Sequence, residues 1–326
     1  MTAQLSQFIG CDKPFNEAKV VLFGAPYDST TSFRPGTRFG PAAMRSESFG
    51  IETYSMLQDR DIAEDAAVFD SGDLELPFGA PDRALDMIEV RAAEILDAGK
   101  IPFLLGGEHL VTLGAVRAAA ERHPGLVVVH FDAHADLRDD YLGVKLSHAC
   151  VLRRCHDILG DERIFQFGIR SGTRDERQFM RDGHVTTELF SDTTLPQVVD
   201  GIGPDAPVYL TVDMDVLDPS EFPGTGTQEA GGLSYARLVD DVRLVCSKLN
   251  VVALDNVELS PALDPSGRST ALACKFLREE LLSICHKLWN AAFPRTPLRH
   301  ARAFCYNSPV PSERARWRVD NVGIES

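Results

Sequence analysis

Six apolar segments constrain the fold of this chain more than any other feature. They cover residues 19–24, 101–105, 126–131, 163–168, 207–212 and 251–254. Several of them lack the alternation of polar and apolar residues that a half-exposed strand shows, which is typical of strands covered on both faces. We therefore expect a mainly parallel sheet that lies between two layers of helices.

Helical patterns lie between these segments. Residues 83–98 place Leu85, Ile88 and Ile95 on one stripe, and the pattern stops at Gly99. Ser234 can cap a second helix, and residues 269–289 form a third apolar-striped stretch. The alternation of strands and helices predicts a three-layer α/β/α fold. We expect a single domain over residues 1–290, followed by a poorly ordered tail, 291–326, rich in Pro, Ser and basic residues.

Composition excludes several classes of protein. The formal net charge of −15 argues against a nucleic-acid partner, and no apolar run approaches the ~20 residues that cross a bilayer. The first residues lack the basic and apolar regions of a signal peptide. The seven cysteines contain no Cys-x-x-Cys pair and are interpreted as reduced thiols. Together these features predict a cytoplasmic protein.

Residues able to bind metals follow four of the apolar segments directly. His109 follows the second of the six segments, Asp132, His134 and Asp136 follow the third, and Asp213 and Asp215 follow the fifth; Glu258 comes shortly after the last. Ligands in open α/β sheets bind outside the carboxyl ends of the strands. If these strands are neighbours, the four clusters meet at one site.

The residue types indicate two metal ions. In an extended chain, residues i, i+2 and i+4 point to one side, so each cluster would present its side chains together. So many carboxylates repel one another unless divalent cations neutralise them. Four Asp and two His exceed the needs of one tetrahedral site. Oxygen and nitrogen ligands without thiolates favour Mn²⁺, with Zn²⁺, Ni²⁺, Co²⁺ or Fe²⁺ as alternatives. Two such ions can activate a shared water.

Other readings have weaker support. Gly106-Gly107 and Gly224-Thr225-Gly226 do not give the glycine pattern of a dinucleotide site, and no Gly-x-Ser-x-Gly elbow of a serine hydrolase occurs. The remaining histidines, apart from His148, are interpreted as surface or satisfied core residues; they are His123, His130, His156, His184, His286 and His300.

Seven segments together resemble the ureohydrolase family, which includes arginase and agmatinase, and the resemblance is closest to agmatinase. They are Gly106–His109, Phe131–Asp136, Ser147-His148, Leu210–Pro219, Pro223–Thr227, Gly231–Ser234 and Val257–Pro261. The stretch Arg34–Pro41 is also agmatinase-like. This chain departs from the usual family pattern at Glu108, at Ala149 and at Leu259-Ser260. None of these departures removes a ligand.

The resemblance implies an arginase-like fold and a binuclear Mn²⁺ site. It implies that Asp132 and Asp213 bridge the ions, that His109 and Asp136 complete one, and that His134 and Asp215 complete the other. Glu258 would pair with the substrate guanidinium, and His148 would relay protons near the leaving amine. The implied reaction is hydrolysis of a guanidino compound to urea and an amine, by a homotrimer or homohexamer.

The choice of substrate depends on the loop 137–147, which should contact the end of the substrate away from the guanidinium. This loop is shorter than the arginase loop that holds the amino-acid head group. This favours agmatine, hydrolysed to putrescine, with Asp139 or Asp140 as partners for its ammonium group. Arg138, Lys145 or Arg174 could instead bind a carboxylate, so guanidinobutyrate stays open, as do arginine, guanidinopropionate and guanidine. A metal-binding member of the fold without turnover is a further alternative.

Overall fold

An eight-stranded sheet forms the centre of the computed structural model, which describes residues 7–292, with side chains up to Cys285. Its strands run in the order β4-β1-β5-β10-β9-β6-β7-β8, and every neighbouring pair is parallel. The strands are β1 (Val20–Ala25), β4 (Val68–Asp73), β5 (Ile101–Gly106), β6 (Val127–Phe131), β7 (Ile164–Ile169), β8 (Thr186–Leu189), β9 (Pro207–Asp213) and β10 (Asn250–Val257). The predicted mainly parallel sheet is confirmed.

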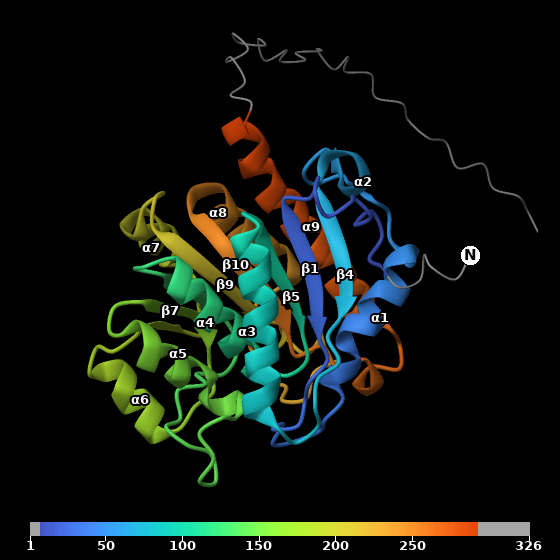
Figure 1. The fold of residues 1–326 in the computed structure, drawn as a ribbon. Helices are drawn as coiled ribbons and strands as arrows, with labels where there is room; N and C mark the ends of the chain where they lie inside the picture. The colour runs from blue at the N-terminus through green and yellow to red at the C-terminus, as the bar shows by residue number, and fades with distance from the viewer. Residues whose placement is uncertain (1–6, 293–326) are drawn as a thin grey trace, which may run out of the picture. The chain divides into compact units, whose positions relative to one another are not determined.

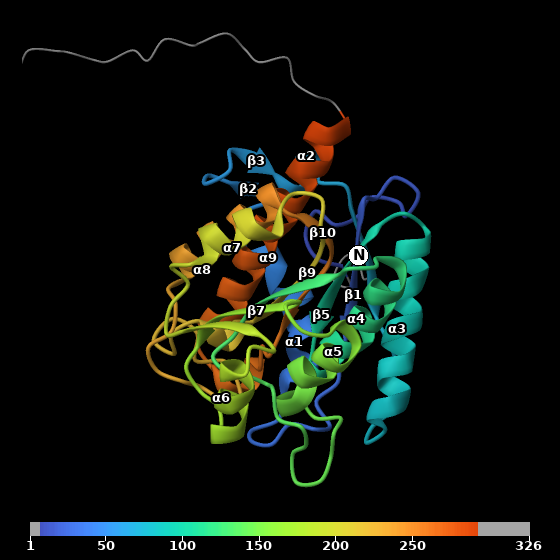
Figure 2. The same cartoon turned by 90° about the vertical axis from the view of Figure 1, so that its left-hand side faces the viewer.

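Helices cover both faces of this sheet (Figure 1). One layer contains α3 (Pro81–Asp97), α4 (Thr112–Arg122), α5 (Val151–Leu159) and α6 (Arg174–Arg181). The other contains α1 (Gly40–Glu47), α2 (Ile62–Asp65), α7 (Leu195–Ile202), α8 (Tyr235–Lys248) and α9 (Arg268–Ala292). Figure 2 shows the two layers on opposite sides of the strands. A small antiparallel hairpin pairs β2 (Tyr54–Ser55) with β3 (Arg60–Asp61).

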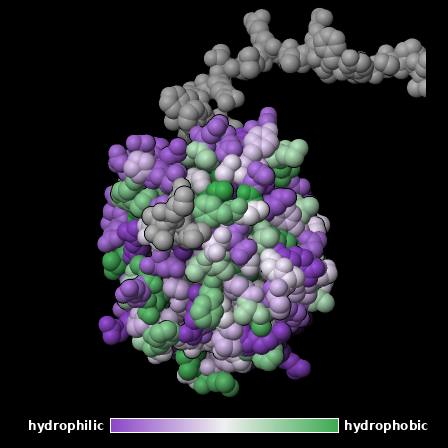
Figure 3. Space-filling view, turned by 90° about the vertical axis from the view of Figure 1, so that its right-hand side faces the viewer, coloured by the Kyte–Doolittle hydropathy of each residue, from purple (hydrophilic) through white to green (hydrophobic). Residues whose placement is uncertain are grey.

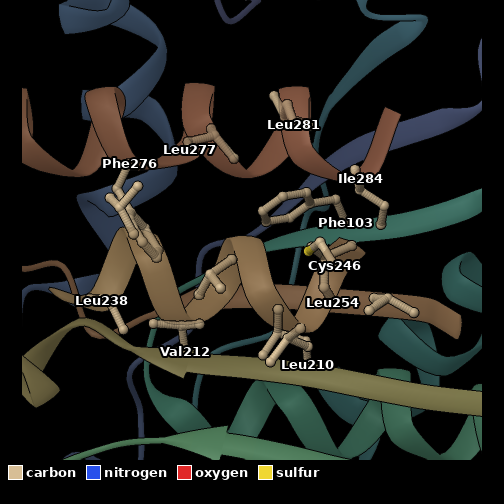
Figure 4. Packing of buried hydrophobic residues seen from close by; sticks show 14 of the residues in the cluster. Phe103, Leu210, Val212, Leu238, Cys246, Leu254, Phe276, Leu277, Leu281 and Ile284 are labelled. Carbon is tan, nitrogen blue, oxygen red and sulfur yellow. The ribbon is translucent and has the colours of Figure 1, made fainter. Parts of the chain in front are cut away.

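Each central strand divides its side chains between two apolar cores. In β9, Leu210 and Val212 belong to the core beneath α8 and α9, whereas Tyr209 belongs to the core beneath α3 to α5. Figure 4 shows the first core, where Leu238 of α8 and Phe276 of α9 pack above β9. Burial on both faces explains why these strands have no polar alternation.

The predicted helices are present with small shifts at their ends. Residues 83–98 correspond to α3, and residues 269–289 lie within α9. The Ser234 side chain accepts a hydrogen bond from the N–H of Arg237 and caps α8 as expected. α9 continues to Ala292, so residues 291 and 292, which were expected in the tail, are helical. Residues 293–326 lie outside the described residues.

None of the helices in the described residues is long and apolar enough to cross a membrane. Figure 3 shows the face on the β4 side, where hydrophilic and hydrophobic residues intermingle. Six of the seven cysteines lie within the described residues, and all six are buried.

Candidate active site

The four strands that precede the predicted site residues are neighbours in the sheet. The order β5-β10-β9-β6 places the residues after these strands at one edge. Register pairs Asn256 with both Leu105 and Val212, and Val212 with Phe131. The structure therefore brings together the clusters that the sequence predicted to converge.

Carboxylates surround one ring nitrogen of His109. Its Nδ1 lies 3.1 Å from Asp132 Oδ2 and 3.3 Å from both Asp136 Oδ2 and Asp213 Oδ2. This Nδ1 is fully buried and makes no hydrogen bond of suitable geometry. Donor atoms separated by about 3.0–3.4 Å match the edges of a metal site with bonds of about 2.1 Å. An orphaned nitrogen facing three carboxylates fits a divalent cation.

A second group lies beside the first and shares Asp132 with it. His134 Nδ1 is 3.0 Å from Asp215 Oδ2 and 3.5 Å from Asp132 Oδ1. The three residues offer ligand atoms that all lie within 4.8 Å of one another. Two groups with a common carboxylate fit two ions better than one.

Turns, rather than extended strands, aim these side chains. Asp213 Oδ1 accepts the N–H of Asp215 at 2.8 Å and caps the 3-10 helix Met214–Val216. Asp132 Oδ1 accepts the N–H of His134 at 2.6 Å in the same way. Asp136 has a φ of +52°, in the left-handed region. The expectation that both segments project their residues as extended strands is therefore wrong, because each leading aspartate folds its own chain back.

The site concentrates negative charge where water is excluded. Burial raises the pKa of the Asp213 carboxyl well above its usual range, and the charges of Asp215 and Asp132 raise it further. Burial and the charge of Asp132 likewise raise the pKa of Asp136 to about 7. Cations in the site would remove this repulsion and favour the ionised carboxylates.

Glu258 follows β10 and reaches the same site. Its Oε1 accepts the backbone N–H of His109 at 2.8 Å, and its backbone N–H donates to the carbonyl of Gly107 at 2.9 Å. A Cβ on Gly107 would lie 1.9 Å from the carbonyl oxygen of Tyr27, so only glycine allows the backbone at position 107 to lie this close to Tyr27. The φ of Glu258 is +68°, an uncommon value that marks a constrained position.

His148 and Glu258 both line a cavity of about 240 Å³ at this edge of the sheet. His148 Nε2 accepts the backbone N–H of Ser32 at 3.2 Å and lies 3.0 Å from the Ser32 hydroxyl. Accepting at Nε2 puts the proton of the neutral ring on Nδ1. Burial, together with the nearby His134 and His109, lowers the pKa of His148 to about 4. The cavity is lined by Ser32, His134, Ala135, Asp136, Arg138, Tyr141, His148, Ala149, Ser171, Gly172, Glu176, Asp213, Thr227 and Glu258.

This constellation can be compared with known proteins. The sequence model of the arginase family matches residues 18–283. The chain belongs to the arginase family. It is 44% identical over 278 residues to a Bacillus anthracis protein named agmatinase, covering 84% of this chain and 95% of that protein. It is also 40% identical over 265 residues to a Thermococcus kodakarensis protein named N(1)-aminopropylagmatine ureohydrolase, covering 80% and 89%.

Solved structures of the arginase family share the fold. The crystal structure of agmatine ureohydrolase of Thermoplasma volcanium superposes with a TM-score of 0.79 at 32% identity. It covers 88% of this chain and 96% of that one. The residues matched by the arginase-family model include all four strand ends that form the site.

Asp139 and Asp140 lie outside the cavity lining. Asp139 pairs with Arg154, whose Nη2 is 2.8 Å from Asp139 Oδ1. Asp140 Oδ1 accepts the N–H of Gly143 at 2.7 Å and so stabilises the loop turn. Neither carboxylate is brought to the cavity, and their contact with substrate stays a prediction from the sequence. Arg138 is different, because it does line the cavity.

The sequence analysis missed the residues that hydrogen-bond to the candidate metal ligands and orient them. His130 is buried, as predicted, but its Nε2 lies 2.8 Å from Asp132 Oδ2, and its Nδ1 accepts from Gln166. This arrangement fixes the tautomer of His130 and orients Asp132. The period-two spacing of His130 and Asp132 in one strand end was the available signal.

A second series of hydrogen bonds orients His109. The Nε2 of His109 lies 3.0 Å from Thr211 Oγ1, which donates to Asp255 Oδ1 at 2.6 Å. With its Nε2 side engaged by Thr211, the ring turns Nδ1 toward the carboxylates. The signal here was Asp255, which directly follows the apolar run Val251–Leu254 in β10, because a buried carboxylate needs partners.

Proposed function

We propose that this chain hydrolyses agmatine to urea and putrescine with two Mn²⁺ ions. The observation that carries the proposal is the buried His109 Nδ1 facing three carboxylates, next to a second group that shares Asp132. Two divalent ions held there would supply an activated water at neutral pH. Water adds to the guanidinium carbon, the bond from that carbon to the amine nitrogen breaks, and the nitrogen takes a proton as it leaves.

Glu258 would bind and orient the guanidinium group. Its carboxylate is buried, lines the cavity and lies close to the candidate ligand His109. A planar guanidinium can donate two parallel hydrogen bonds to one carboxylate, which fixes its orientation. The backbone bond from His109 to Oε1 restrains Glu258, so that the reacting carbon is presented in one geometry.

His148 would move the proton that the leaving amine requires. With Nε2 held by Ser32, the neutral ring presents Nδ1–H as its free donor. A low pKa keeps the ring neutral in the free enzyme. The ring would therefore first take up the proton that the attacking water gives up, and the protonated ring, a strong acid, would then pass a proton to the leaving nitrogen. His148 and Glu258 both line the cavity, so a leaving nitrogen bound there could reach His148.

The substrate's distal end is the feature on which candidate substrates differ. The two relatives described above carry names that refer to agmatine compounds, which supports an amine at that end. A guanidino acid such as guanidinobutyrate is the second candidate, because the cationic Arg138 lines the cavity and could pair with a carboxylate. The guanidinium of Arg138 lies 4.8 Å from the ring centroid of Tyr141, which keeps it at the cavity wall.

The remaining assignments rest on chemistry and family resemblance. Ligands that are all carboxylate and imidazole support Mn²⁺, with Ni²⁺, Co²⁺ or Zn²⁺ as substitutes. Buried thiols support a reducing, cytoplasmic location. Assembly as a homotrimer or homohexamer follows from resemblance to the family.

Release of urea from a substrate panel tests this proposal. The purified chain is loaded with Mn²⁺, Ni²⁺, Co²⁺ or Zn²⁺ and offered agmatine, arginine, guanidinobutyrate, guanidinopropionate and guanidine. We expect the highest kcat/KM for agmatine with Mn²⁺. A higher value for guanidinobutyrate would favour the second candidate. If no compound released urea, the remaining interpretation would be a metal-binding member of the fold that has no turnover.

A further inference from the structure

Two imidazoles and one carboxylate meet at a second place in the fold, away from the cavity described above. They are His156 of α5, Asp161 in the turn between α5 and β7, and His184 in the turn between α6 and β8. His156 Nε2 and His184 Nδ1 each lie 2.8 Å from the same oxygen, Asp161 Oδ1. None of the three residues lines the active-site cavity.

We propose that His156, Asp161 and His184 form a binding site for a third metal ion, a first-row divalent cation such as Zn²⁺. The three ligand atoms lie within 4.8 Å of one another. Two imidazole nitrogens with one carboxylate oxygen are a donor set that zinc and nickel bind well. The donor set differs from the carboxylate-rich active site, which is better suited to manganese.

Aromatic packing holds the two imidazoles in place. The ring of Phe179 stacks on His184 with centroids 4.3 Å apart and an interplanar angle of 26°, and it meets His156 edge-on at 4.9 Å. The guanidinium of Arg153 covers the Phe179 ring at 4.0 Å. This packing limits the rotamers of both histidines before an ion binds, which lowers the entropic cost of binding.

Small movements would complete the coordination. Bonds of about 2.0–2.1 Å in a tetrahedral site separate ligand atoms by about 3.3 Å, so Asp161 needs to withdraw by about half an ångström. Its side chain is 59% exposed and can do so freely. The same exposure leaves one or more positions for water. A neutral imidazole bound to the ion through one nitrogen would carry its proton on the other ring nitrogen.

The ion would join two segments, because His156 and Asp161 are five residues apart and His184 lies 23 residues after Asp161. It would connect the end of α5 to the turns that precede β7 and β8, and so stabilise this corner against unfolding. At an ion concentration about 100-fold above Kd, we expect the thermal midpoint to rise by roughly 4–5 °C. This expectation does not depend on the substrate or on turnover.

Zinc titration of the untagged, manganese-loaded enzyme tests the site. Zinc is added in excess Mn²⁺, unbound metal is removed by gel filtration, and both metals are counted by mass spectrometry. We expect the natural chain to retain about one more zinc per chain than His184→Ala or Asp161→Ala, at equal manganese content. The matched control His123→Ala removes a histidine from another loop and should keep the extra zinc.

Thermal unfolding gives an independent readout on the same proteins. Zinc should raise the midpoint of the natural chain and of His123→Ala, and it should not raise that of His184→Ala or Asp161→Ala. Equal zinc retention by the natural chain and both cluster variants would overturn the proposal, as would equal midpoint shifts. Two cluster variants keep the test decisive if one of them folds poorly.

Discussion

The hydroxyl of Thr30 accepts a hydrogen bond from the backbone N–H of His148 at 3.0 Å. The same hydroxyl donates to Glu108 Oε1 at 2.6 Å, and Glu108 also accepts from the N–H of Thr30 and the hydroxyl of Thr31. Glu108 is fully buried next to His109. Thr30 therefore links the loop that carries His148 to the strand end that carries His109.

This link predicts that Thr30→Val lowers kcat without loss of metal. Valine has the same shape but removes both hydroxyl hydrogen bonds, so His148 loses one of its supports. A loss of about 1–2 kcal/mol corresponds to a fall of roughly tenfold in kcat. Steady-state kinetics and metal analysis of the purified variant measure both quantities. Thr30→Ser should restore activity, and an unchanged kcat in Thr30→Val would show that the link is not needed.

Asp213→Asn should reduce metal content and activity together. The substitution keeps the size of the side chain and removes a charge that faces His109 Nδ1 at 3.3 Å. We expect fewer than two manganese ions per chain and a fall in kcat of more than about 100-fold. Asp218→Asn, on the exposed loop further along, is the matched control and should keep both metals. Full metal retention in Asp213→Asn would contradict a bridging role.

Glu258→Gln should abolish most turnover and leave the metals bound. Glutamine can still accept the backbone N–H of His109, but it no longer offers a negative charge to a guanidinium. Losing two hydrogen bonds to a charged group, each of about 1.5–3 kcal/mol, predicts a fall in kcat/KM of at least about 100-fold. Metal analysis and kinetics on one preparation separate the effects. Loss of manganese would instead make Glu258 a ligand.

Ionisation of Asp264, near the start of α9, should make the free energy of unfolding depend on pH. Its carboxylate accepts hydrogen bonds from Ser269 N–H at 2.8 Å and from the Ser266 hydroxyl at 2.6 Å. Burial opposes ionisation, but the hydrogen bonds from Ser266 and Ser269 prevail and lower the pKa of Asp264 to about 2. Because the pKa is lower in the folded chain, this contribution is present above about pH 4 and is lost as pH falls toward 2.

Asp264→Asn should therefore lower the free energy of unfolding at neutral pH by about 1–2 kcal/mol, because a neutral amide oxygen accepts the hydrogen bonds from Ser266 and Ser269 more weakly than a carboxylate does. The difference from the natural chain should shrink between about pH 4 and pH 2. Urea unfolding followed by circular dichroism at several pH values measures it. A difference that stays constant down to pH 2 would show that ionisation of Asp264 does not contribute.

The central strands and the site at their ends could be predicted because burial imposes a strong pattern. A strand covered on both faces, such as β9, is mostly apolar, and the carboxylates at its end, Asp213 and Asp215, then stand out. The edge strand β4, which reads Val-Phe-Asp-Ser-Gly-Asp, lacks that pattern and was missed. So was β8 at the opposite edge, which reads Thr-Thr-Glu-Leu.

Contacts between loops were beyond sequence reasoning. Thr30 and His148 are separated by 118 positions, and neither lies in a periodic segment that would reveal the contact. Asp139 illustrates the same limit, because the sequence does not reveal that this carboxylate pairs with Arg154. Loop charges have several partners within reach, and only the folded chain selects among them.

The most direct test of the account is product analysis with agmatine and the manganese-loaded enzyme. We predict equimolar urea and putrescine, formed at a rate that saturates with agmatine and is lost when a chelator removes the metal. The same assay on Asp213→Asn should show little product. Release of ammonia in place of urea, or no product from agmatine at full manganese loading, would contradict the account.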